Sequence, residues 1–170
     1  MGKAISQNLK KTLSLLVTRK ITPPDNPELA IGAVGPDKIR IINWELVSRL
    51  NLSRETIDTQ TKKAIAEVEE RQKKWGQKTP KVTDKKVILV DDGIATGATV
   101  QAAIAWLKSQ KPKSIILAVP VASPETVIKL EAMVDKMIVL ESPADFSSVG
   151  QFYKSFPQVS DEEVAKLLKS

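Results

Sequence analysis

The chain has 170 residues, no cysteine, no histidine and a formal net charge of +6, and only 4% of its residues are aromatic. This length suits one compact domain with a buried core, so we expect a single domain over residues 1–170. Without cysteine, no thiol chemistry is available. No signal peptide or membrane-length apolar run is seen, so we expect a soluble, cytoplasmic protein without membrane contact. Because lysines and glutamates are interspersed and aromatics are few, the positive charge predicts attraction of small polyanions, not of nucleic acid.

The N-terminal region predicts a helix followed by a strand. Gly2 to Lys11 has a helical pattern, and Leu13 to Thr18 is an apolar run typical of a strand. Arg19 and Lys20 come next, and we expect them at the carboxyl end of that strand, where α/β sheets commonly bind ligands. Two cations there could hold pyrophosphate, the alternative being a solvated basic loop.

A long segment rich in turn formers, Ile21 to Pro36, follows this cationic pair. Its prolines and glycines predict a loop or a short ribbon. Loops of this length commonly carry a function, although a passive linker is the alternative.

The next stretch predicts a brief strand and two helices. Ile39 to Ile42 is the strand and Trp44 to Leu50 the first, short helix. Ser53 is placed to cap a long polar helix that runs through Trp75 and stops at Gly76. Its many charged residues indicate a solvated face, so we assign this helix to packing or to a subunit contact.

The most informative segment is Val87 to Val100. Val87 to Val90 is short and apolar throughout, which predicts a strand buried on both faces of a parallel sheet. Two adjacent acids, Asp91 and Asp92, follow it, and then glycines break the strand before a helical pattern of apolar residues begins.

The small residues from Ala95 to Thr99 therefore lie at the N-terminus of a predicted helix, where unpaired backbone N–H groups and the helix dipole favour a phosphate. Thr96 and Thr99 add hydroxyl donors. Asp91 and Asp92 can accept hydrogen bonds from vicinal ribose hydroxyls or hold a divalent cation, the alternative being that they merely cap the helix. The Lys-Ser/Thr pair of the P-loop and the spacing of the dinucleotide-binding fingerprint are both missing.

The C-terminal half continues the alternation of strand and helix. Ser114 to Val121 predicts a second buried strand, Ser123 a helix cap before Pro124, and Lys136 to Leu140 a third strand. This alternation predicts an α/β fold with a parallel sheet flanked by helices.

The tail, residues 142–170, gathers aromatic residues in a chain that is otherwise poor in them: Phe146, Phe152, Tyr153 and Phe156. These rings could form a wall on which a nucleobase stacks, or they could simply fasten the tail to the core. Ser160 to Glu163 predicts a capping box that opens a final helix through Leu168.

At the segment Val87 to Val100 the chain resembles the type I phosphoribosyltransferases, whose fingerprint is four apolar residues, two acids and a Gly/Thr-rich phosphate loop. Three further stretches, Asn26 to Val34, Val119 to Thr126 and Val149 to Tyr153, are similar to a bacterial and archaeal branch of that family in which the acceptor is not established. The resemblance implies a Rossmann-like α/β fold.

It also implies a function: transfer of a 5-phosphoribosyl group from phosphoribosyl pyrophosphate (PRPP) to a nucleobase or related nitrogen acceptor, with Mg²⁺ and release of pyrophosphate, in nucleotide metabolism. The catalytic residues would be Asp91 and Asp92, which bind the ribose hydroxyls and directly or indirectly the metal, together with Arg19 and Lys20 on the pyrophosphate. The substrate-binding residues would be Val90, Gly93, Ile94, Ala95, Thr96, Gly97, Ala98 and Thr99 around the 5′-phosphate, and Phe152 and Tyr153 on the acceptor.

Two further segments gain roles from the resemblance. The segment 21–36 would be a lid, with Asp25, Asn26 and Glu28 closing over the site, and residues 142–170 would form the hood that selects the acceptor.

The chain departs from the family at its start. A strand and a Pro-Arg-Gly-Gly-like pyrophosphate loop usually precede the first helix, whereas Met1 begins almost at that helix. We therefore expect this form to lack both, to associate as a homo-oligomer through the exposed sheet edge, and to catalyse poorly. The alternative function is a non-catalytic sensor of PRPP or a nucleotide, or an assembly domain.

Overall fold

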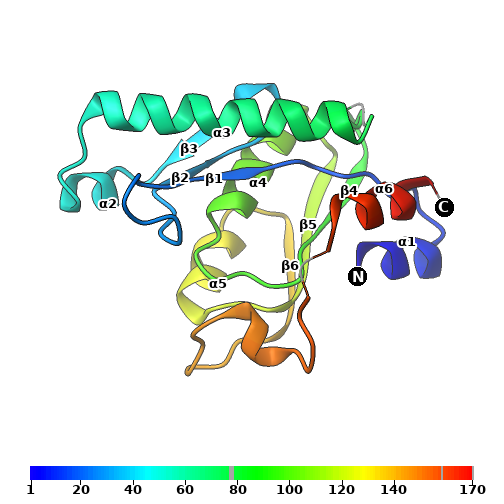
Figure 1. Ribbon diagram of the computed structural model, residues 1–170. Coiled ribbons are helices and arrows are strands. Elements are labelled where there is room, and N and C mark those ends of the chain that lie inside the picture. Colours follow the sequence, from blue (N-terminus) through cyan, green and yellow to red (C-terminus); the bar gives the residue numbers. More distant parts are fainter. Residues whose placement is uncertain (77–78, 158, 170) are drawn as a thin grey trace. The chain divides into compact units, whose positions relative to one another are not determined.

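A computed structural model describes residues 1–76, 79–157 and 159–169, and the chain forms two compact units (Figure 1). The first unit contains Met1–Leu15, Pro80–Gly97 and Lys111–Ser170. The second contains Leu16–Thr79 and Ala98–Gln110. Each unit is built around its own three-stranded sheet.

The first unit contains a parallel sheet in the order β4-β5-β6. Its strands are β4 (Lys86–Val90), β5 (Ser114–Val121) and β6 (Lys136–Glu141). Its helices are α1 (Gly2–Leu9), α5 (Pro124–Glu131), the 3₁₀ helix η2 (Val149–Phe152) and α6 (Asp161–Lys169). The predicted α/β fold with a parallel sheet is thereby confirmed, and the three strands lie within a residue of their predicted bounds.

One face of this sheet is buried and the other is partly open. Along β5, burial alternates strictly, with Leu117 fully buried and its sequence neighbours half-buried. On the other face Ile138 of β6 is 41% exposed and Ile88 of β4 is 38% exposed. The prediction that β4 is buried on both faces is therefore wrong, because this second face of the whole sheet stays partly open, along β5 as well as β4.

The second unit has an antiparallel sheet in the order β1-β2-β3. Its elements are β1 (Arg19–Ile21), β2 (Gly32–Val34), the 3₁₀ helix η1 (Pro36–Lys38), β3 (Arg40–Ile42), α2 (Trp44–Arg49), α3 (Arg54–Lys74) and α4 (Ala98–Ser109). Helices α3 and α4 both contact the sheet, and every residue of the central strand β2 is buried. Figure 1 shows α3 lying along the three strands.

Helix α3 begins and ends where its capping signals predict. The Ser53 hydroxyl accepts a hydrogen bond from the Thr56 N–H, and Gly76 takes a positive φ of 58° just beyond the last turn. Ile57 and Val68 are buried on its narrow apolar side. The assignment of this helix to packing is confirmed by its contacts with β1 and β2.

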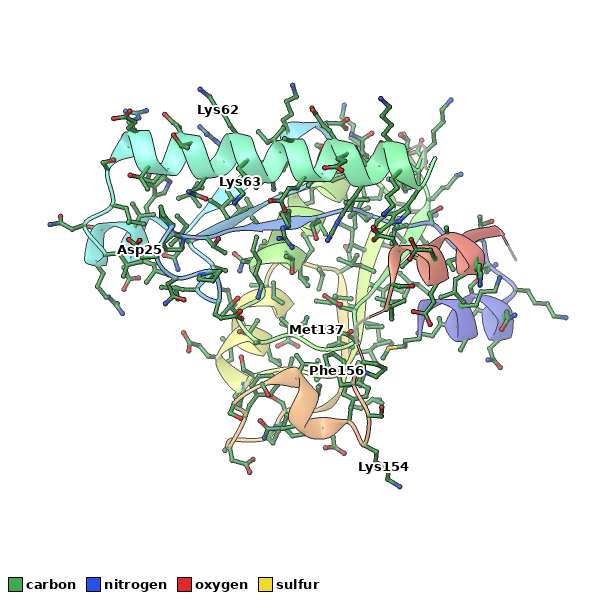
Figure 2. All side chains as sticks on the ribbon, viewed as in Figure 1. Asp25, Lys62, Lys63, Met137, Lys154 and Phe156 are labelled. Atoms are coloured by element: carbon green, nitrogen blue, oxygen red, sulfur yellow. The ribbon has the colours of Figure 1, made fainter. Side chains whose placement is uncertain are left out.

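The first predicted strand does not form. Over Leu13 to Thr18 no strand is present, and within the described residues the ladder starts at Arg19, the first residue that pairs with β2. The segment 21–36 contains β2, which pairs with β1 as a short antiparallel ribbon, so of the two predicted forms the structure shows the ribbon, with an irregular connection between Ile21 and Gly32. Asp25 lies on this connection (Figure 2), and Asn26 and Glu28 are exposed beside it.

The turn between β2 and β3 is held by a buried tryptophan. Asp37 in η1 has a left-handed backbone, φ 54°, and its Oδ2 accepts a hydrogen bond from the indole Nε1 of Trp106 at 2.7 Å. Trp106, on α4, is only 1% exposed. The indole N–H therefore depends on this carboxylate for its partner.

Replacing Asp37 by alanine should lower the free energy of unfolding by about 1–3 kcal/mol, since a buried donor loses its acceptor. Asp37→Asn should cost less, because the amide oxygen still accepts and asparagine tolerates the left-handed backbone. Chemical denaturation of both variants measures the difference. Equal stability of Asp37→Ala and the wild type would contradict the role of this bond.

No helix among the described residues has the length and apolar character needed to cross a membrane.

Candidate functional site

The two acids follow β4 directly, at the carboxyl end of the parallel sheet. Asp91 is partly buried and Asp92 is exposed. The N–H of Asp92 donates to the Oδ1 of Asp91 at 3.0 Å, which holds the Asp91 side chain against the start of the loop.

Both carboxylates have perturbed acidity. Burial, and next the negative charge of Asp92, raise the pKa of Asp91 from 3.8 to about 6, although the hydrogen bond from the Asp92 N–H opposes them. Burial also raises the pKa of Asp92, against the backbone N–H groups of Asp92 and Gly93. Two adjacent acids whose ionised forms are disfavoured in this way are typical of a site that binds hydrogen-bond donors or a cation.

The loop after the acids continues the sheet for one residue. The N–H of Ile94 donates to the carbonyl of Val121 at 3.0 Å, and the N–H of Ser123 donates to the carbonyl of Ile94 at 3.0 Å, so Ile94 forms a parallel bridge with Ala122. Ile94 is 2% exposed. The loop is thereby attached to the segment that joins β5 to α5.

The next carbonyl, that of Ala95, receives side-chain donors from the same segment. The Thr126 hydroxyl donates to it at 2.6 Å, and the Ser123 hydroxyl lies 2.9 Å from the same oxygen and 2.8 Å from the Thr126 oxygen. Ser123 does occupy the predicted N-cap of α5, but its side chain makes no capping hydrogen bond. The prediction of a serine cap is wrong in this respect, because the hydroxyl is turned to the loop.

At two positions of the loop, Gly93 and Gly97, neighbouring side chains leave too little room for a Cβ. A Cβ on Gly93 would lie 2.5 Å from a methyl group of Val149, in η2. Gly97 has φ 71°, and a Cβ there would lie 2.8 Å from the methyl group of Thr126. Larger residues at either position would have to displace these side chains.

The aromatic tail contacts the backbone of the acids through the hydroxyl of Tyr153. Tyr153 donates from its phenol to the backbone carbonyl of Asp92 at 2.5 Å. Burial, and then the charges of Asp92 and Asp91, raise the pKa of Tyr153. The ring of Tyr153 also lies against Phe156, with centroids 4.9 Å apart, and Phe146 stacks on Phe152 at 5.4 Å. Figure 2 labels Phe156 on this tail.

The remaining predicted site residues belong to the second unit. Ala98 and Thr99 form the first turn of α4, directly after Gly97, as predicted. Arg19 and Lys20 open β1, so the prediction that they stand at the carboxyl end of a strand is wrong. The Nε of Arg19 pairs with Glu67 of α3 at 2.5 Å.

Because successive side chains of a strand point to opposite faces, Arg19 and Lys20 do not share a face of the sheet. The ion pair with Glu67 also places Arg19 on the α3 side. One phosphate group therefore cannot face both side chains in this arrangement.

Three residues that hold the loop were not predicted as site residues: Ser123, Thr126 and Val149. All three lie within stretches that resemble the family, which was the only sequence signal for a site role, and Ser123 was predicted as a helix cap. Their role depends on a loop about thirty or more residues away in sequence, and no local spacing rule relates them to it.

The sequence as a whole matches the family model described as "Phosphoribosyl transferase domain" over residues 1–153. The chain belongs to this family. The matched range includes both acids, the loop and Tyr153, and ends at that tyrosine.

Similar phosphoribosyltransferase sequences occur in two strains of Mycobacterium tuberculosis, each under the name "Putative phosphoribosyl transferase". Each is 35% identical to this chain over 166 residues, and the match covers 96% of this chain. The chain spans 38% of the length of these curated relatives. The crystal structure of TT1426 from Thermus thermophilus is similar as well, with a TM-score of 0.78, 30% identity, and coverage of 98% of this chain and 79% of that chain.

The perturbed acid of this phosphoribosyltransferase domain predicts a pH-dependent stability change. Because the folded state raises the pKa of Asp91 from 3.8 to about 6, its contribution to stability is present below pH 3.8 and is lost as the pH rises through 6. Asp91→Asn cannot ionise, so it should stabilise the protein at pH 8, by at most about 3 kcal/mol at about 1.4 kcal/mol per pKa unit.

Urea unfolding at pH 5 and pH 8 measures this effect, and the gain should shrink at the lower pH. Asp25→Asn, at an exposed aspartate of the second unit, is the control. A gain from Asp91→Asn that is the same at both pH values would show that its cause is not ionisation.

Proposed function

We propose that the chain binds PRPP and transfers its 5-phosphoribosyl group to a nucleobase or related nitrogen acceptor, releasing pyrophosphate. The observation that carries this proposal is the acid pair at the end of β4, with Asp91 partly buried, followed at once by a loop whose backbone is tied to the start of α5. Membership of the family supports the class of reaction.

In the proposed reaction the bond from the ribose C1 to the pyrophosphate oxygen breaks, and the electron pair leaves with pyrophosphate. A bond from C1 to the acceptor nitrogen forms, and that nitrogen loses a proton. The sugar carries positive charge in between, so binding and charge stabilisation matter more than a strong base. This suits a chain without histidine.

Asp91 and Asp92 would accept hydrogen bonds from the two ribose hydroxyls, since ionised carboxylates are acceptors only. The loop from Gly93 to Thr99 would surround the 5′-phosphate at the beginning of α4, where backbone N–H groups and the helix dipole favour an anion. Lys20 is the better candidate of the cationic pair for pyrophosphate, because Arg19 is already paired with Glu67.

Mg²⁺ fits this donor set. Its preferred ligands are oxygens, and it commonly uses one or two carboxylates together with substrate phosphates and water. Asp91 and Asp92 would hold it, directly or through water, and burial raises the pKa of both carboxyls, a cost that a bound cation would offset. When bound, Mg²⁺ would supply charge neutralisation for the leaving pyrophosphate.

The tail is the proposed acceptor side. Tyr153 contacts the backbone of Asp92 and presents its ring beside Phe156, so a planar base could stack there, in addition to the fastening role that its hydrogen bond supports. Phe152 and Tyr153 each lie against another ring, and the hydrogen bond to the Asp92 carbonyl makes Tyr153 the better candidate.

We also propose that the protein is cytoplasmic and forms a homo-oligomer. The exposed side chains of Ile138 and Leu140, 41% and 76% exposed on β6, support association. Sedimentation at several concentrations tests it.

A second candidate is a sensor that binds PRPP or a nucleotide without turning it over. The ion pair between Arg19 and Glu67 favours it, because it withdraws one of the two cations expected on pyrophosphate. Release of pyrophosphate from PRPP with a panel of purine and pyrimidine bases distinguishes the transferase from the sensor.

The double variant Asp91→Asn with Asp92→Asn should bind PRPP at least about tenfold more weakly, since two charged acceptors are lost, each bond being worth about 1.5–3 kcal/mol. Calorimetric titration with PRPP and Mg²⁺, and with ribose 5-phosphate, measures the loss. The affinity of the wild type should also fall below pH 6, where Asp91 takes up its proton.

The matched control is Glu55→Gln with Glu70→Gln, which removes two exposed charges from α3. It should bind like the wild type. Unchanged PRPP affinity in the Asp91 and Asp92 variant, with its fold intact by circular dichroism, would remove the acids from the site.

A further inference from the structure

The loop after the acids is tied to the start of α5 through two successive carbonyl groups. Ile94 accepts from the Ser123 N–H at 3.0 Å. Ala95 accepts from the Thr126 hydroxyl at 2.6 Å, with the Ser123 hydroxyl 2.9 Å away. Thr126 is 6% exposed, and its bond to Ala95 is partly shielded from water.

A planar trans peptide directs its C=O and its N–H to opposite sides. The described residues contain no cis peptide bond. The N–H of Ala95 therefore points away from Ser123, and the N–H of Thr96 points away from Thr126. Two successive amides are therefore directed away from α5, and successive N–H groups directed alike are donors of the kind that can bind an anion.

Thr126 and Ser123 thus decide which way this part of the loop presents its donors. The Thr126 hydroxyl donates to Ala95, and the Ser123 hydroxyl can donate either to the same carbonyl or to the Thr126 oxygen, which strengthens the first bond. Ser123 does this instead of capping its own helix. A residue that gives up a usual local role commonly serves a site.

We propose that Thr126, assisted by Ser123, is a positioning residue of the phosphate site: by holding the Ala95 carbonyl against α5 it keeps the Ala95 and Thr96 amides directed at the phosphate of a sugar phosphate. This inference rests on the proposed function and adds to it two residues that touch no ligand. Its consequence is that one buried hydroxyl controls phosphate affinity from behind the loop.

Thr126→Val tests the hydroxyl by itself, because valine keeps the β-branched shape and the methyl group that lies beside Gly97. The Ala95 carbonyl then keeps only the Ser123 hydroxyl as a side-chain donor and is held less firmly, so the affinity for ribose 5-phosphate should fall about tenfold, the equivalent of one hydrogen bond. Thr126→Ser keeps the hydroxyl and should stay within about threefold of the wild type. Calorimetric titration with ribose 5-phosphate measures all three proteins.

Thr61→Val is the matched control. Thr61 is a buried threonine of α3, 2% exposed, and its hydroxyl has no hydrogen-bond partner among the described residues. The same chemical change there should leave the affinity for ribose 5-phosphate unchanged. A loss of affinity caused only by a weakened fold would follow the unfolding midpoint of each variant instead.

A second readout follows the amide itself. In ¹⁵N-labelled wild-type protein, addition of ribose 5-phosphate should shift the Thr96 amide proton downfield, because that N–H comes to donate to the phosphate. The shift should be smaller in Thr126→Val and restored in Thr126→Ser. Should Thr126→Val not fold, Ser123→Ala removes the assisting hydroxyl and should lower the affinity about threefold.

The outcomes separate the two proposals. If the wild type binds ribose 5-phosphate and both Thr126→Val and Ser123→Ala bind it equally tightly, the positioning role alone is overturned. Equal losses in Thr126→Val and Thr126→Ser also overturn it, since the methyl group and not the hydroxyl would then be responsible. No binding of ribose 5-phosphate or PRPP by the wild type overturns the positioning role and the proposed function together.

Discussion

The parallel bridge between Ile94 and Ala122 is the contact on which the site depends. It pairs the two segments again in the register of the ladder between β4 and β5, beyond the end of β4, so that the segment after the acids is held to the sheet. Because Ile94 is buried, its apolar side chain adds to the backbone bonds in holding the loop. The acids before the bridge and the carbonyl of Ala95 after it are both positioned as a result.

Asp91 is held in place at a cost to the stability of the fold. Burial and the neighbouring charge of Asp92 raise its pKa to about 6, so at neutral pH the folded protein contains an ionised group that is better solvated in the unfolded chain. A bound ribose or cation would offset this cost by supplying hydrogen bonds or positive charge. The proposed function therefore accounts for a feature that is unfavourable for folding alone.

The tail packs against the backbone that carries the acids. Tyr153 donates to the Asp92 carbonyl and Val149 lies directly on Gly93, so η2 closes against the backbone that carries the acids. Gln151 accepts from the N–H groups of Ser147 and Ser148, which stiffens η2 internally. The match to the family model ends at Tyr153, in agreement with a domain whose last contribution is this contact.

The sequence by itself determined the elements whose signals are local: α3 between Ser53 and Gly76, the strands β5 and β6, and the order of strand, acids, loop and helix. The capping box from Ser160 to Glu163 also forms as predicted. Caps and periodicity act within a few residues and are therefore readable from the chain. The tertiary structure alone decided where β1 begins and that β4 is an edge strand. It also decided that Arg19 pairs with Glu67, and that the Ser123 hydroxyl donates to the loop and does not cap its own helix. Each of these depends on a partner distant in sequence, because a strand needs a paired neighbour, an ion pair needs its counter-charge, and a hydroxyl donates to the best acceptor that folding brings within reach.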